Sequence, residues 1–326
     1  MGKKNIVWND YISQEERFAD FFNGVVFQGE QVVFPEDLVP LDSKLWRRQP
    51  DKNSYNEFIR DTVKLWQHED EKYILSLEPE DSPHHALPVK YMNYESVQYD
   101  RQYKENMKAH RKNRDLCSDE YLAGFSVSDR LFPVVTIGIY LGEKKWSGSS
   151  RLSDITGISE KTGKISRYFA PLCNEFRVNL VNIYDLETCD VLQSDLREVF
   201  GFLRLRGDKA QLRNYVEENE GFRHLQEDAF DVLSVYGTMD LKIDREEYRT
   251  KEGIDMCLAL QQWEEEARAE GRAKGKAEGT AQGIAAMNEL IYVMVKEGRE
   301  EELLRSSRDY DFQRKLMEEC GIQMLM

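Results

Sequence analysis

The chain has 326 residues, which is enough for about two domains of roughly 150 residues each. Forty-five Lys and Arg against sixty Asp and Glu give a formal net charge of −15, so bulk positive charge cannot be what holds a nucleic acid, and any polyanion needs a local basic patch. Hydrophobic residues at 40%, with 11% aromatic, exclude disorder as the main state.

Cysteine use and the apolar runs bear on the compartment. Five cysteines are scattered without a Cys-x-x-Cys pair, which is typical of a reducing compartment rather than of a disulfide framework. The first ten residues contain no apolar stretch like that of a signal peptide, and the longest apolar run, residues 131–141, is too short to span a bilayer. We therefore expect a cytoplasmic protein without membrane contact.

Residues 1–189 mix helical and strand patterns. Ser13 with Glu16 fits a capping box, and apolar residues then recur at helical spacing from Phe18 to Val25. Residues 35–40, which begin and end with proline, indicate a loop. This part of the chain therefore opens with one short helix.

The middle of this segment predicts a hairpin and buried strands. The runs 59–66 and 72–78, separated by a polar stretch, are typical of two antiparallel strands. Residues 94–113 have helical spacing with a basic side, and the β-branched runs 132–140 and 177–184 predict buried strands. Strands mixed with helices indicate an α/β domain.

The pattern of the rest of the chain predicts helices. Residues 190–251 carry apolar side chains at intervals of three and four, broken by glycines. Residues 252–326 form a charged segment in which four glycines repeat with a period of four: Gly271, Gly275, Gly279 and Gly283. Each costs a helix about 1 kcal/mol, which suggests either close helix approach in a homo-oligomer or a flexible low-complexity tail.

Three acidic residues carry the chemical hypothesis. If the hairpin turns about Glu69 and Asp70, the residue numbers of each directly paired couple add up to 139. Asp61 then lies opposite Glu78, with the two Cβ atoms about 5 Å apart. Glu80 shares that face, because side chains alternate along a strand. Two carboxylates about 4 Å apart repel by roughly 4 kcal/mol, so Mg²⁺ or Mn²⁺ would stabilise the group. The alternative is that residues from Glu80 onward begin an exposed acidic loop.

A basic helix follows the acidic group. Six cations lie between residues 101 and 114, and four of them share one helical face: Lys104, Lys108, Arg111 and Lys112. An acidic group followed by a basic helix is the arrangement that metal-assisted cleavage of a phosphodiester requires. The acids bind the metal and the cations hold the DNA backbone. A solvated basic face remains the alternative.

A series of short motifs resembles a known family. In order along the chain they are residues 17–23 (RFADFFN), 35–38 (PEDL), Arg60-Asp61, Leu77-Glu78-x-Glu80, 86–90 (ALPVK), Tyr94, Tyr99-Asp100-x-Gln102, Lys145-Trp146 and Leu152-x-Asp154. Together they look like the Rpn family of recombination-promoting nucleases, also called PD-(D/E)XK nuclease family transposases. The resemblance covers nearly the whole chain, including the glycine-repeat tail.

The resemblance implies a restriction-endonuclease-like fold, a mixed sheet flanked by helices with a helical C-terminal region. It implies Mg²⁺-dependent cleavage of DNA, with Asp61 and Glu78 as metal ligands and Glu80 at the motif's third catalytic position. The sequence departs from the family at that position, because Glu80 stands where the family has Lys or Gln. Tyr99 and Gln102 match a helix that either contacts DNA or buttresses the site.

These observations lead to a ranked set of functions. The first is a metal-dependent DNA endonuclease, cytoplasmic, linked to recombination or transposition by the resemblance. The second is a catalytically degenerate nuclease fold that binds DNA or a protein, and the third is an oligomerisation module that acts through its tail.

Overall fold

The computed structural model describes residues 3–41, 44–48, 55–59, 62–158, 165–186, 189–237 and 245–322. Asp61, one of the predicted metal ligands, lies outside these described residues. The chain forms two compact units, Met1–Cys257 and Leu258–Met326. The predicted segments 1–189, 190–251 and 252–326 stay a prediction as functional domains.

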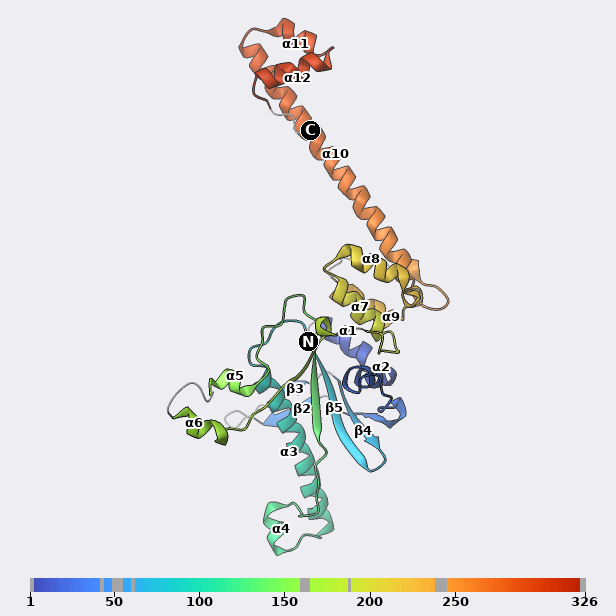
Figure 1. Ribbon diagram of the computed structural model, residues 1–326, viewed down its shortest axis with the longest axis vertical. Coiled ribbons are helices and arrows are strands. Elements are labelled where there is room, and N and C mark those ends of the chain that lie inside the picture. The colour runs from blue at the N-terminus through green and yellow to red at the C-terminus, as the bar shows by residue number, and fades with distance from the viewer. Residues whose placement is uncertain are drawn as a thin grey trace. The chain divides into compact units, whose positions relative to one another are not determined.

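The first unit is an α/β structure built on a five-stranded mixed sheet (Figure 1). Its strands, in spatial order, are β1 (Leu38–Pro40), β4 (Thr62–His68), β5 (Glu71–Glu80), β6 (Val134–Tyr140) and β7 (Asn179–Asn182). The first three pair antiparallel, while β5, β6 and β7 pair parallel. A separate hairpin joins β2 (Lys44–Arg48) to β3 (Tyr55–Ile59).

Helices cover both faces of this sheet. On one face, Val63, Ile74 and Val134 pack with Tyr99 of α3 (Leu87–Asn113). On the other face, Lys64 lies beside Phe18 of α2 (Glu15–Phe21), because neighbouring residues of a strand point to opposite faces. The sheet interior is therefore enclosed between α3 and the N-terminal helices.

Three helices that follow the sheet belong to the same compact unit. Their bounds are α7 (Leu196–Leu205), α8 (Lys209–Glu218) and α9 (Glu227–Tyr236), and they pack with α1 (Lys3–Ile12) and α2. Trp8 of α1 stacks on Phe200 of α7 at 6.2 Å, and Phe21 meets the same ring edge-on at 6.3 Å. Such aromatic pairs contribute about 0.5–1.5 kcal/mol beyond the area that they bury.

Shorter elements complete the described part of the first unit. They are η1 (Phe22–Val26), η2 (Pro35–Asp37), α4 (Ser118–Ala123), α5 (Leu152–Thr156), α6 (Ser166–Phe169), η3 (Ala170–Leu172), η4 (Ile183–Asp185), η5 (Glu220–Arg223) and η6 (Arg245–Tyr248). Among the helices that the structure describes, none has both the length and the apolar composition that crossing a bilayer requires.

The second unit has its own small core. Helix α10 (Met256–Lys296) ends beside α11 (Glu300–Ser306) and α12 (Tyr310–Glu319). Leu290 and Met294 of α10 are buried with Leu316, Met317 and Ile322. The glycines of the repeat lie in the middle of α10, and a Cβ added at any of them would meet no described atom within 4 Å beyond its chain neighbours and the adjacent helix backbone.

The predicted hairpin register is confirmed in the described strands. Pairs run from Thr62 with Leu77 to His68 with Glu71, so each pair sums to 139 as expected. The bounds of the first strand were wrong, because Ile59 belongs to β3 and pairs with Lys44 rather than extending β4.

Two local predictions near the N-terminus were also wrong. The capping box does not form, because the Ser13 hydroxyl donates to the Asp10 carbonyl at the end of α1 and the N-cap of α2 is Gln14. Residues 38–40 form edge strand β1 instead of a loop, and a proline is tolerated there because an edge strand has unpaired positions.

Candidate functional site

The site begins with the alternation of side chains along the end of β5. Ser76, Glu78 and Glu80 share one face of this strand, which is the face that α3 covers. Their neighbours on β6 include Thr136 opposite Ser76 and Gly138 opposite Glu78. Two of the three predicted carboxylates therefore lie on one face at the end of the strand.

Glu80 is held by two donors from the first turns of α3. Lys90 Nζ lies 2.7 Å from Glu80 Oε1, and the Tyr91 hydroxyl donates to the same oxygen at 3.0 Å. The Glu80 side chain is 7% exposed and that of Lys90 is 27% exposed. This carboxylate is thus charge-neutralised inside the protein, where an ion without a partner would be strongly destabilising.

Glu78 is more deeply buried, with none of its surface exposed. The Ser76 hydroxyl donates to Glu78 Oε1 at 3.1 Å, which orients the carboxylate from two residues back along the strand. Gly138 beside it admits Tyr91, since a Cβ at that position would lie 2.5 Å from the Tyr91 hydroxyl oxygen. A side chain at residue 138 would therefore displace the donor that holds Glu80.

The pKa of Tyr91 is affected by the negative charges of both glutamates. Burial, then the negative charges of Glu80 and of Glu78, raise the pKa of this phenol well above its ordinary value. Tyr91 therefore remains a neutral hydrogen-bond donor at neutral pH. Both carboxylates lie close enough to Tyr91 to act on it electrostatically.

The two glutamates differ in how well they suit a divalent cation. Carboxylate oxygens suit Mg²⁺ and Mn²⁺, and the buried Glu78 supplies such oxygens beside the Ser76 hydroxyl. Glu80 fits it poorly, because Oε1 already accepts from Lys90 and Tyr91. Within the described residues, no three His, Cys, Asp or Glu side chains group so as to hold a metal ion.

Tyr99 and Gln102 hold α3 to the beginning of β6. The Tyr99 hydroxyl accepts a hydrogen bond from the Val134 amide at 3.1 Å. The Gln102 side-chain amide makes two bonds to the backbone of Phe132, donating at 3.1 Å and accepting at 2.7 Å. Of the two roles expected for these residues, the contacts match buttressing, and a DNA contact by them stays a prediction.

The predicted basic residues lie along the exposed outer part of α3. Lys104 pairs with Asp100 at 2.6 Å, one turn back on the same helix. Lys108, Arg111 and Lys112 are exposed, and no carboxylate of the described chain lies within ion-pair distance of them. Three cations of the predicted DNA-binding face are therefore available to an external anion.

Sequence reasoning missed Lys90 and Tyr91 as site residues. The predicted helix began at residue 94, whereas α3 begins at Leu87 with Pro88 in its first turn. Proline at the start of a helix is a recognised signal, and it would have placed Lys90 on the first turns after the strand that carries Glu80. The contact itself depends on the path of the six residues that join β5 to α3.

Comparison of the chain with protein-family models, with curated proteins and with solved structures found no match in any of the three.

Proposed function

We propose that the chain is a metal-dependent DNA endonuclease of the PD-(D/E)XK type, with a restriction-endonuclease-like fold. The observation that carries the proposal is the Lys90–Glu80 contact of 2.7 Å beside Glu78. A lysine next to two carboxylates is the set of residue types that metal-assisted phosphodiester cleavage uses. Here the lysine comes from α3, while a glutamate occupies the strand position at which the resembled family has Lys or Gln.

Each residue has a role in the proposed site. Asp61 and Glu78 would hold Mg²⁺ or Mn²⁺, which when bound supplies positive charge at the phosphate and lowers the pKa of a water. Ser76 orients the Glu78 carboxylate, and Tyr91 holds Glu80 through its hydroxyl. Lys90, held beside Glu80, would supply positive charge to offset the negative charge that develops on the phosphate.

The basic side of α3 supports DNA as the substrate. Lys108, Arg111 and Lys112 belong to the same helix as Lys90, so one rigid element carries both the lysine of the site and the exposed cations. The net charge of −15 makes such a local patch necessary for contact with a polyanion.

The test is nicking of supercoiled plasmid with Mg²⁺ or Mn²⁺ by the full chain and by Asp61→Asn, Glu78→Gln and Lys90→Met. We expect each variant to lose at least about a hundredfold in rate, as is common when a group that stabilises transition-state charge is removed. Lys251→Ala, at an exposed position outside the site, is the matched control. Equal nicking by all proteins would identify a contaminant and contradict the proposal.

A second candidate function is a degenerate nuclease fold that binds DNA or a protein. The observation that favours it is the burial of both acids, Glu78 at 0% and Glu80 at 6% exposed, together with neutralisation of Glu80 by Lys90. Absence of nicking, with DNA binding that depends on the cations of α3, would establish this function instead.

A further inference from the structure

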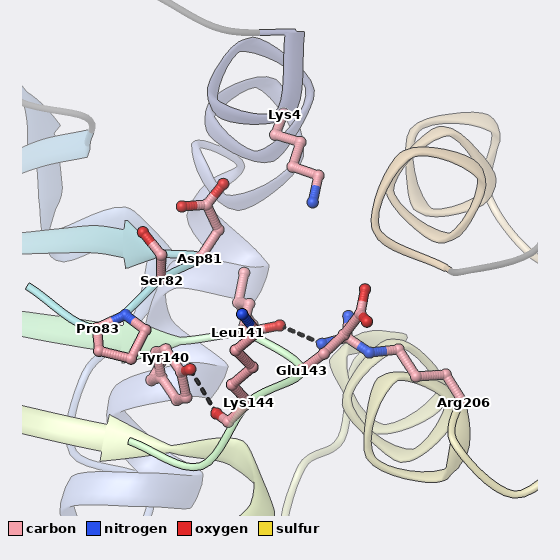
Figure 2. Close-up of a pocket in the computed structure, with 10 residues that line it drawn as sticks. Lys4, Asp81, Ser82, Pro83, Tyr140, Leu141, Glu143, Lys144 and Arg206 are labelled. Atoms are coloured by element: carbon pink, nitrogen blue, oxygen red, sulfur yellow. Dashed lines mark hydrogen bonds between the residues drawn. The ribbon is translucent and has the colours of Figure 1, made fainter. Parts of the chain in front are cut away.

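A separate cavity of about 300 Å³ lies beyond the ends of β5 and β6 (Figure 2). These strands are parallel, and their carboxyl ends, Glu80 and Tyr140, are paired neighbours. In open α/β sheets, ligands characteristically bind just outside the carboxyl ends of parallel strands. The cavity lies outside the carboxyl ends of these two strands.

Three cations from distant parts of the sequence line the cavity. They are Lys4 of α1, Lys144 in the loop after β6, and Arg206, the residue that follows α7. Figure 2 shows Lys4 reaching down from its helix and Arg206 reaching in from another helix toward Leu141. Within the described chain, none of the three forms an ion pair with a carboxylate.

Arg206 is the most informative of these residues. It is 7% exposed, and its guanidinium donates to the carbonyls of Tyr236 at 2.9 Å and of Leu141 at 2.6 Å. Its buried Nε atom has no hydrogen-bond partner. A guanidinium fixed by two neutral carbonyls keeps its full positive charge, which a bound anion would compensate.

Two carboxylates, Asp81 and Glu143, and the Ser82 hydroxyl also line the cavity. Three cations against two acids leave a formal excess of one positive charge in a protein whose net charge is −15. Carboxylates repel a bare anion but accept hydrogen bonds from hydroxyl or amino groups. The lining therefore suits a ligand with an anionic group at one end and hydrogen-bond donors at the other.

We infer that this cavity binds a phosphate monoester whose organic part carries hydrogen-bond donors, as in a sugar phosphate or a nucleotide. The phosphate lies against Lys4, Lys144 and Arg206, and the hydroxyl or amino groups meet Asp81 and Glu143. The volume equals that of about ten water molecules at roughly 30 Å³ each, which suits a pentose phosphate. The inference does not require cleavage of DNA, so it stands apart from the proposed nuclease activity.

Calorimetric titration of the full chain, without divalent cation, tests the site with ribose 5-phosphate, ribose and inorganic phosphate. We expect saturable binding of ribose 5-phosphate and weaker binding of the other two. The double variant Lys4→Met with Lys144→Met keeps the side-chain stems and removes two charges. Its affinity for ribose 5-phosphate should be lower by about tenfold or more. Lys251→Ala is the control for loss of charge elsewhere on the unit.

Substitution of an acidic residue of the cavity provides an independent test. Asp81→Asn should lower the affinity for ribose 5-phosphate, because it removes a carboxylate that accepts a hydrogen bond from a sugar hydroxyl. The affinity for inorganic phosphate should stay unchanged or rise, because a repelling charge is removed. Equal affinity of ribose and ribose 5-phosphate, or unchanged affinity in the double-lysine variant, would overturn the inference. So would the absence of saturable binding by any of the three compounds.

Two sources of the phosphate monoester are separated by one further titration, with 2′-deoxyadenosine 5′-monophosphate. Tighter binding than that of ribose 5-phosphate assigns the cavity to nucleotides, and equal or weaker binding assigns it to sugar phosphates. Either result supports a phosphate-ester site, and neither depends on the outcome of the plasmid assay.

Discussion

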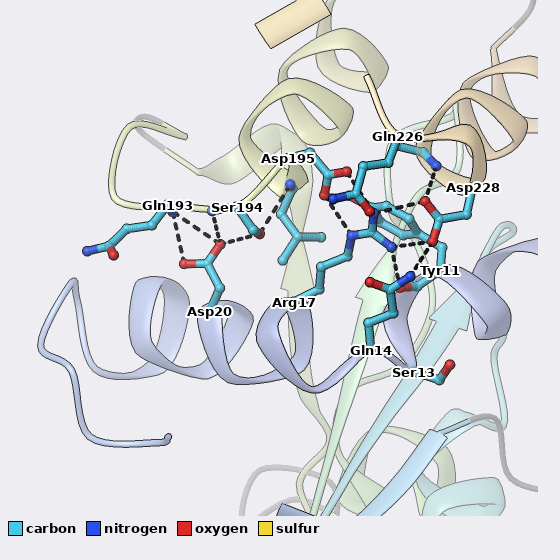
Figure 3. Close-up of polar contacts among 12 residues, drawn as sticks. Tyr11, Ser13, Gln14, Arg17, Asp20, Gln193, Ser194, Asp195, Gln226 and Asp228 are labelled. Atoms are coloured by element: carbon cyan, nitrogen blue, oxygen red, sulfur yellow. Dashed lines mark hydrogen bonds and ion pairs between the residues drawn. The ribbon is translucent and has the colours of Figure 1, made fainter. Parts of the chain in front are cut away.

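Arg17 donates hydrogen bonds from Nε and Nη2 to the two carboxylate oxygens of Asp195, at 2.7 and 2.8 Å (Figure 3). The same guanidinium bonds both oxygens of Asp228, at 2.5 and 2.9 Å, and the Gln226 side chain at 2.8 Å. One side chain of α2 thereby joins the residue before α7 to the beginning of α9. Helices α7 and α9 are thus connected to the N-terminal helices by charge as well as by aromatic packing.

Arg17→Met should lower the free energy of unfolding by about 3 kcal/mol. That is the lower end of the cost of breaking a buried ion pair, because Asp195 and Asp228 keep 16% and 29% exposure and are partly solvated. Burial lowers the pKa of the guanidinium, but hydrogen bonds to Asp228 and Asp195 raise it by more, so Arg17 stays charged throughout. Denaturation in urea measures the loss.

Arg101→Met is the matched control for this prediction. Arg101 forms an exposed pair with Glu105 one turn away, and such pairs contribute about 0.3–0.5 kcal/mol. Equal destabilisation by the two substitutions would show that the Arg17 network contributes no more than a surface pair.

The Glu80–Lys90 pair should show strong coupling in a double-mutant cycle. Lys90→Met alone leaves the buried Glu80 carboxylate with Tyr91 as its remaining donor, whereas Lys90→Met with Glu80→Gln removes the charge as well. We expect the double variant to be more stable than Lys90→Met, with a coupling energy of about 1–3 kcal/mol. Additive losses in urea denaturation would contradict a direct ion pair.

His110 should make the stability of the region after α3 depend on pH. Its Nδ1 lies 2.7 Å from Asp115 and its Nε2 lies 2.8 Å from Asp129, so both nitrogens donate only when the ring is protonated. Hydrogen bonds to Asp115 and to Asp129 raise the pKa of His110. A raised pKa gives a contribution that is complete below the ordinary histidine value of about 6.5 and is lost as pH rises through the folded value.

Unfolding free energies measured from pH 6 upward should therefore fall more steeply for the natural chain than for His110→Gln. Charged neighbours along the end of α3, Arg111 and Arg114, are present in both proteins and do not alter the comparison. Parallel curves for the two proteins would contradict the role of the imidazolium.

The exposed cations of α3 should govern how DNA binding depends on salt. Each phosphate contact contributes about 0.9 to the slope of log affinity against log salt, so replacing Lys108, Arg111 and Lys112 by Ala should flatten the slope by about 2 to 3. Lys104→Ala should change it less, because Asp100 already partners that lysine. Fluorescence anisotropy over a salt series measures both, and an unchanged slope in the triple variant would exclude this face.

Substitution of the glycines in α10 distinguishes a tail that self-associates from a flexible low-complexity tail. Replacing Gly271, Gly275, Gly279 and Gly283 by Ala should stabilise the helix by about 1 kcal/mol per site, since the added Cβ atoms would clash with no described side chain or other helix. Circular dichroism follows the gain in helicity. A lower mass by sedimentation would support the predicted self-association, and an unchanged mass would contradict it.

The sequence by itself determined the features that depend on neighbouring residues. The hairpin register followed from one polar turn and the strand period of two, because a short turn sets every pair beyond it. The exposed basic side of α3 likewise followed from the helical period. The same local reasoning paired residue 61 with Glu78, although Asp61 lies outside the described residues.

Tertiary structure decided which charges meet. Lys90 reaches Glu80 because α3 starts at Leu87 and lies across the sheet, and no period in the sequence encodes that path. Lys4 and Arg206 line one cavity although about two hundred residues separate them. Periodicity is a property of adjacent residues, whereas contacts between distant segments arise from the packing of whole elements, so only the folded chain brings these groups together.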